Sequence, residues 1–116
     1  MTVQGQATTR VARKPSIAFE KWRFSIQTAA DVNQLLLVVA AYLSGWDPEE
    51  LARIPAGAAA PIRSTAELMA RAVDLSRLEL GFEGGAKGDH ALLQELSLTV
   101  AFASSRMRYL QSLGLR

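Results

Sequence analysis

The chain has no cysteine and only one histidine among its 116 residues. Without cysteine it can form no disulfide, no thiolate metal site and no cysteine nucleophile, which fits a reducing compartment. A single histidine leaves little material for acid–base catalysis, and the G-x-S-x-G motif of nucleophilic serines is missing. We therefore predict no catalytic residue, no cofactor and no metal ligand, and we favour a non-enzymatic protein over an enzyme.

Long hydrophobic runs are missing as well. The longest, LLLVVAAYL at residues 35–43, is far shorter than the roughly 20 residues that span a bilayer. The opening MTVQGQATTR is polar and lacks the apolar segment of a secretory signal. We therefore expect a cytoplasmic protein with no membrane partner, and the composition, rich in Ala, Leu and Arg, favours a bacterial origin.

The positive charge is concentrated at the start of the chain. Residues 1–24 hold five of the 13 Lys and Arg but only one of the 11 Asp and Glu, a net charge of +4. The rest of the chain therefore carries eight basic and ten acidic residues, a net charge of −2. Because residues 1–15 are polar and have little to bury, we predict a flexible basic arm there and a single all-helical domain over residues 16–116.

Apolar residues recur at helical spacing in several later segments. The predicted fold is therefore all-α: a small bundle of four to five helices with a disordered basic N-terminal arm. Residues 16–27 fit two patterns. Trp22, Phe24 and Ile26 alternate as in a strand, whereas Phe19, Trp22 and Ile26 are spaced as on one face of a helix. We favour the helix, because no other segment offers a strand partner.

The segment TAADVNQLLLVVAAYLSG, residues 28–45, has signals for both ends of a helix. Thr28 is placed as the N-cap, with Asp31 three residues later, and Gly45 stands where a left-handed residue ends many helices. The middle of the segment is apolar on every side, which is typical of a buried helix. We therefore expect this helix to be covered all round.

Two more helices have recognisable starts. Asp47, followed by Glu50 three residues later, is placed as the N-cap of a short helix. Ser64 and Glu67 form a capping box at the start of a longer helix. On that helix Glu67 and Arg71 have the spacing of a surface ion pair.

The stretch GFEGGAKGDH, residues 81–90, is rich in glycine and contains the only histidine. A phosphate-binding loop of the G-x-x-x-x-G-K-[ST] type needs a hydroxyl after its lysine, but Lys87 is followed by Gly88 and Asp89. The spacing of an HExxH zinc motif is also absent around His90. We therefore interpret the stretch as a turn between two helices, with Asp89 as the N-cap of the second.

The last predicted helix, residues 90–113, has two apolar rows and ends before Gly114. The first row has heptad spacing and consists of Leu93, Leu96, Val100, Ala103, Met107 and Leu110. The second row, our candidate interface, consists of Leu98, Phe102, Tyr109 and Leu113. The two rows together offer more apolar surface than a bundle of this size can cover, so we predict a homodimer. The sequence leaves open whether the heptad row is an intramolecular seam or the dimer face.

Basic residues close to an aromatic residue allow a second interpretation. The candidate nucleic-acid contacts are Arg10, Arg13, Lys14, Lys21, Trp22 and Arg23. Lys and Arg neutralise phosphates, and a tryptophan can stack on a base, but Trp22 can equally anchor the arm to the core. We therefore predict a small helical protein that acts by association with other proteins, and we keep a nucleic-acid-binding regulator as the alternative.

Overall fold

The computed structural model describes the backbone of residues 15–81 and 87–116 and the side chains of residues 20–81 and 90–116. These ranges contain five helices and no strand: α2 (Pro15–Gln27), α3 (Val32–Ser44), α4 (Pro48–Leu51), α5 (Thr65–Gly81) and α6 (Lys87–Ser112). The predicted all-α bundle of four to five helices is confirmed. The ambiguous segment after the arm is helical, and all of the predicted arm except Pro15 lies outside the described residues.

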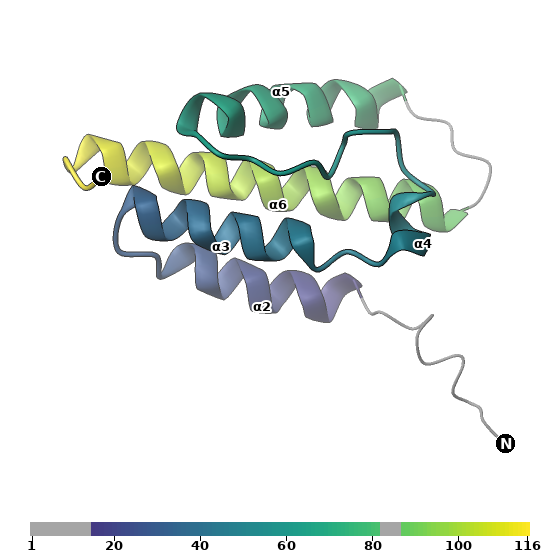
Figure 1. Ribbon diagram of the computed structural model, residues 1–116, viewed down its shortest axis with the longest axis horizontal. Coiled ribbons are helices and arrows are strands. Elements are labelled where there is room, and N and C mark those ends of the chain that lie inside the picture. The colour runs from purple at the N-terminus through teal and green to yellow at the C-terminus, as the bar shows by residue number, and fades with distance from the viewer. Residues whose placement is uncertain (1–14, 82–86) are drawn as a thin grey trace, which may run out of the picture.

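The long helix α6 is the centre of the bundle and contacts α2, α3 and α5. Figure 1 shows that α2 and α6 run in the same direction, whereas α3 and α5 run the opposite way. After the short α4, an extended segment returns along the bundle to the start of α5 (Figure 1). Among the described residues, no helix is both long enough and apolar enough to cross a membrane.

The heptad row of α6 lies in the core. Its six residues are at most 1% exposed: Leu93, Leu96, Val100, Ala103, Met107 and Leu110. They pack with buried residues of the other helices in one hydrophobic cluster. The heptad row is therefore an intramolecular seam, which answers the question that the sequence left open.

The start of α3 differs from the prediction. Asp31, not Thr28, is the N-cap, because its carboxylate accepts a hydrogen bond from the amide of Gln34 at 2.8 Å. The Thr28 hydroxyl instead donates to a carbonyl of the preceding helix at 2.9 Å and so belongs to the end of α2. Gly45 follows α3 as predicted, but its φ of −85° is right-handed, so the expected left-handed ending is wrong.

The prediction that α3 is covered all round is also wrong. Its neighbours α2 and α6 cover one side, and on the opposite side Leu37 is 71% exposed. Ala40 and Ala41 are exposed on the same side. The sequence pattern indicated a helix that is apolar all round, but the described residues of the other helices pack against only one side of it.

The ends of the other helices are closer to the predictions. The amide of Asp47 donates to the Glu50 carboxylate at 3.2 Å, as expected at the start of α4. The amide of Glu67 donates to the Ser64 hydroxyl at 3.1 Å, which confirms that half of the second capping box. The helix α6 begins at Lys87, two residues before the predicted N-cap Asp89, and residues 82–86 of the predicted turn lie outside the described residues.

Arg71 has a different role from the one predicted. Its guanidinium donates to the carbonyls of Ala58 and Ala60 at 3.0 and 2.7 Å, and to that of Pro61 at 3.5 Å. The predicted ion pair with Glu67 is wrong, because the Glu67 carboxylate instead accepts from a backbone amide just before α5, at 2.7 Å. Arg71 therefore fastens the extended segment before α5 to that helix.

We expect Arg71→Ala to lower the free energy of unfolding by about 2 kcal/mol, because it removes charge-assisted hydrogen bonds from carbonyls of a partly buried loop. The measurement is urea denaturation followed by far-UV circular dichroism. Arg77→Ala is the matched control, since Arg77 is exposed on the same helix. Equal urea midpoints for the two variants would contradict the role of Arg71.

Candidate functional site

The candidate interface lies largely on the side of α6 that faces away from the core. Leu98 and Tyr109 are 51% and 53% exposed there, and Phe102 is partly buried between α6 and α2. Leu113 is 55% exposed but follows the last residue of α6, so it lies beyond the helix. Three of the four predicted residues are therefore on one helical surface.

Small residues complete this surface. Ala101 and Ser105 are exposed at helical spacing from Leu98 and Tyr109. We call the set Leu98, Ala101, Phe102, Ser105 and Tyr109 the outer face of α6. Leucine and tyrosine at its two ends with small residues between them leave a shallow surface that the side chains of another protein can fill.

Two grooves flank the outer face of α6. The groove towards α2 is lined by Arg23, Leu98, Ala101, Phe102 and Ser105. The groove towards α5 is lined by Met69, Ala72, Val73, Ser76, Arg77, Ala101, Ser104 and Arg108. Ala101 belongs to both, so the two grooves form one continuous surface. On α5, Met69 and Val73 are 44% and 50% exposed, which widens the apolar area beyond what the sequence predicted.

The charged side chains that line these two grooves are all arginines: Arg23, Arg77 and Arg108. The guanidinium carbon of Arg23 lies 5.4 Å from the centre of the Phe102 ring, a cation–π distance. The outer face of α6 is therefore apolar in its middle and positively charged at its rim. Such a surface complements an apolar partner that carries carboxylates around its edge.

Arg106 links the C-terminal half of α6 to the connection between α2 and α3. It donates to the carbonyl of Ala29 at 2.8 Å, and its guanidinium carbon lies 5.1 Å from the centre of the Tyr109 ring. The Tyr109 ring is thereby held beside α6 while half of its surface stays exposed. An aromatic side chain that is already ordered loses little entropy on binding, which favours its use in an interface.

The candidate nucleic-acid contacts are only partly brought together. Arg10, Arg13 and Lys14 lie outside the described residues, and Lys21 and Arg23 are exposed on α2. Trp22 is partly buried, and its ring packs edge-on against Tyr42 with 5.7 Å between centroids. Trp22 therefore anchors α2 to the core, and its contact with Tyr42 competes with stacking on a base.

A polar contact inside the core was missed by the sequence analysis. The Tyr42 hydroxyl donates to the Glu95 carboxylate at 3.4 Å, and the two side chains are only 1% and 6% exposed. Trp46 also packs edge-on against the Tyr42 ring, with 6.2 Å between centroids. This contact joins α3 to α6 across 53 residues of sequence, and local spacing carries no signal for it.

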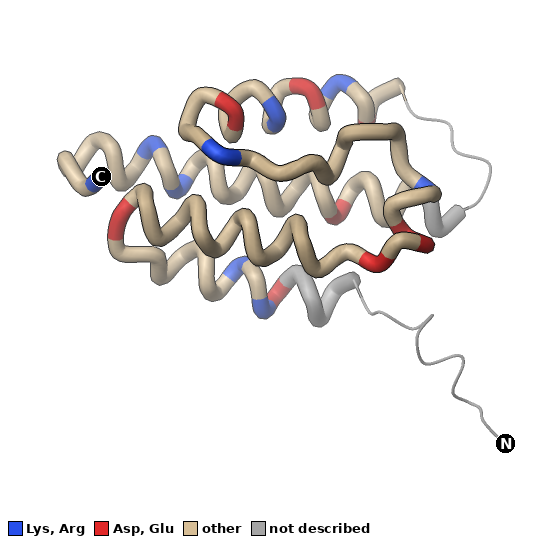
Figure 2. The backbone as a smooth tube through the Cα atoms, viewed as in Figure 1, with Lys and Arg blue, Asp and Glu red and all other residues tan. Residues whose placement is uncertain are grey.

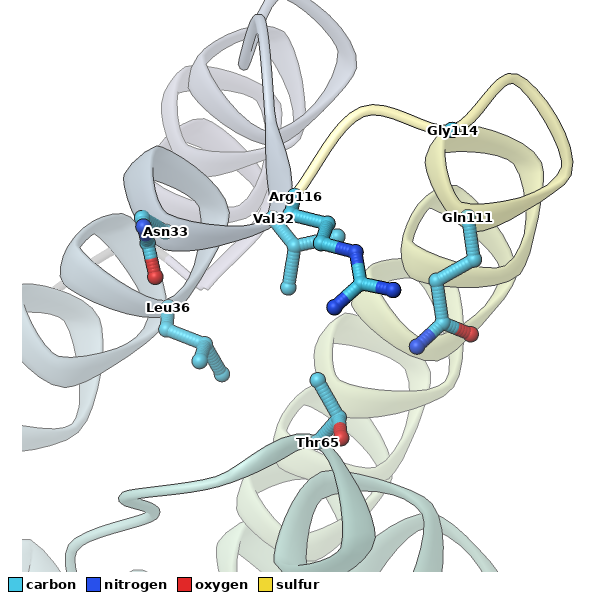
Figure 3. A pocket seen from close by; sticks show the side chains of 7 residues that line it. All are labelled: Val32, Asn33, Leu36, Thr65, Gln111, Gly114 and Arg116. Carbon is cyan, nitrogen blue, oxygen red and sulfur yellow. The ribbon is translucent and has the colours of Figure 1, made fainter.

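One cavity lies at the opposite end of the bundle from α4, where the starts of α3 and α5 meet the end of the chain (Figure 3). Its volume is about 390 Å³, and it is lined by Val32, Asn33, Leu36, Thr65, Gln111, Gly114 and Arg116. Figure 3 shows the Arg116 and Gln111 side chains reaching into this space. Both residues are exposed, so neither is a buried polar group held ready for a ligand. We therefore assign no ligand to this cavity.

The candidate metal ligands do not form a cluster in the part of the chain that the structure describes. Among the side chains that the structure describes, residues 20–81 and 90–116, no three His, Cys, Asp or Glu residues gather as a metal site would require. His90 is exposed near the start of α6. The outer face of α6, with its two flanking grooves, is therefore the candidate functional site.

Comparison with known proteins adds no relative to this description. No family model, no curated protein and no solved structure matches the chain.

Proposed function

We propose that this chain acts by association with other proteins in the cytoplasm, that it has no catalysis of its own, and that the outer face of α6 is a contact surface. The observation that carries the proposal is the exposure of Leu98 and Tyr109, each about half exposed on a continuous apolar surface. Apolar surface of this kind, rimmed by polar residues, is a feature of protein–protein interaction sites.

The charges at the rim indicate the kind of partner. If two copies met through this surface about a two-fold axis, Arg23, Arg77 and Arg108 of each copy would approach the same arginines of the other. Like charges brought together in this way oppose binding. We therefore propose a partner protein with acidic side chains for the outer face of α6. The predicted homodimer remains part of the proposal.

Nucleic-acid binding, the alternative, has less support. Trp22 is held against Tyr42, and the described basic residues of α2 are only Lys21 and Arg23. An electrophoretic shift that is strong at low salt and lost at high salt would revive this alternative.

Photo-crosslinking tests the contact surface directly. We would replace Tyr109 with a photoreactive phenylalanine analogue in the full chain, in the cells in which the protein is native. Phe24 is the matched control, because this aromatic residue is 68% exposed on α2 and does not belong to the outer face of α6. We expect adducts with another protein from position 109, weakened by Arg108→Glu, and none from position 24. The proposal is wrong if neither position gives an adduct, or if both give the same ones.

A further inference from the structure

The outer face of α6 is the floor of a trough that has helices on both sides. The wall on the α5 side presents Met69 and Val73, which are 44% and 50% exposed, and the wall on the α2 side presents Arg23. Both α5 and α2 lie lengthwise beside α6 (Figure 1). We call the outer face of α6 and its two flanking grooves the α6 trough.

Elsewhere around α6 the chain itself closes the bundle. The extended segment after α4 contributes Ala58 and Ile62, each 3% exposed, to the same hydrophobic cluster as the buried residues of α6. Arg71 holds this segment to α5 through backbone carbonyls. Among the described residues, no segment covers the α6 trough in this way, and Leu98 and Ala101 are exposed in it. The trough therefore has room for a segment that the described chain does not supply.

The shape of the α6 trough fits a helix. Leu98 and Tyr109 lie eleven residues apart on α6, which is about 17 Å along its axis, or three turns. Ala101 and Ser105 between them are small, so the axis of another helix can approach to about 8 Å. An extended peptide fits less well, because the described residues contain no strand with which its backbone could pair. A helix satisfies its own backbone groups.

The charges around the trough are positive. Arg23 on α2, Arg77 on α5 and Arg108 on α6 are exposed and line it. Figure 2 shows that the charged positions in the C-terminal half of α6 are basic. Residues 1–14 contain three basic residues and no acidic one, so these arginines repel that segment, and they repel the same arginines of a second copy. Carboxylates of a different protein are attracted instead.

We infer that the α6 trough binds an amphipathic helix of a partner protein, about three turns long, with an apolar stripe over Ala101 and Ser105 and acidic residues on both flanks. Such a helix contacts the floor with residues at helical spacing, while its carboxylates approach Arg23 on one side and Arg77 on the other. This inference rests on the proposed contact surface and adds what occupies it.

Selection from a random peptide library tests the chemistry of the occupant without presupposing it. The full chain is the bait, and the displayed peptides have about 16 residues, enough for four helical turns. We expect the recovered peptides to share apolar residues three and four apart, flanked by Asp and Glu. In fluorescence anisotropy at low salt, Arg77→Glu should weaken binding of the best peptide about tenfold. The matched control is Arg63→Glu, at an exposed arginine just before α5, with a change of less than about twofold.

Cross-linking of the best peptide to the full chain tests its shape. A photoreactive phenylalanine analogue at position 98, and in a second protein at position 109, marks two points of the floor about 17 Å apart. We expect the two probes to capture peptide residues about eleven apart, as in a helix that lies along α6. An extended peptide covers the same distance with only about five residues.

Each contrary result indicates a different occupant. Peptides without acidic residues, no enriched peptide at all, or equal affinities of Arg77→Glu and Arg63→Glu overturn the inference. Captured residues about five apart overturn the helix. A wild-type dimer in light scattering that Leu98→Glu dissociates overturns it in favour of a second copy, and binding to phosphatidylserine vesicles without any enriched peptide overturns it in favour of an anionic membrane. The adduct from position 109 in cells is measured independently, so the proposed function can stand when this inference fails.

Discussion

Val100→Asp is expected to unfold the protein. Val100 is 1% exposed in the middle of the heptad row of α6. It belongs to the hydrophobic core cluster that α6 shares with the other helices. A carboxylate there would be buried without a partner, which costs several kcal/mol. The total stability of a small domain is only about 5–15 kcal/mol, so this one substitution removes much or all of it.

Ala101→Asp is the matched control, because Ala101 is the next residue on the same helix and is exposed. Its expected cost is below about 1 kcal/mol and comes from helix propensity alone. Far-UV circular dichroism and the dispersion of amide signals in an NMR spectrum distinguish the two outcomes. A Val100→Asp protein that melts near the wild-type temperature would show that α6 does not pack through its heptad row.

Tyr42→Ala is expected to produce the second largest loss, about 3–5 kcal/mol, the range for large aromatic side chains removed from cores. Tyr42 is 1% exposed, and its ring packs edge-on against both Trp22 and Trp46. Without the ring, both tryptophans lose a neighbour and α2 loses one of its contacts with the core. The two residues are the only tryptophans in the chain, so the fluorescence of the protein reports on this site during urea denaturation.

Tyr42→Phe separates packing from hydrogen bonding. It keeps the ring and removes only the hydroxyl that donates to Glu95, so we expect a loss of about 1–3 kcal/mol. If the alanine and phenylalanine variants have the same stability, the aromatic packing contributes little. In that case the buried hydrogen bond, rather than the ring, would be the main link between α3 and α6.

Local patterns predicted the parts of this fold that depend on neighbours in sequence. The heptad row of α6 gave the core of the longest helix, because residues three and four apart share a helical face. Hydroxyl and carboxyl side chains gave the starts of α4 and α5 for the same reason. Thr28 misled the prediction, because its hydroxyl can bond backwards to the preceding turn as well as forwards to the next helix.

Contacts between distant segments could not be predicted in this way. The bonds from Arg71 to the carbonyls of Ala58 and Ala60, and the contact between Tyr42 and Glu95, depend on how the helices come together. The candidate interface on α6 was visible as a second apolar row, but its arginine rim includes residues from α2 and α5. For α3, the pattern indicated that the helix needs cover without indicating which chain supplies it.

The position of α6 in the sequence also has a consequence during synthesis. This helix contacts α2, α3 and α5, yet it follows all of them along the chain. A growing chain therefore displays the apolar sides of three helices before the helix that covers them has been made. Folding must wait until α6 has left the ribosome, because contacts between segments far apart in sequence form only when both segments are available.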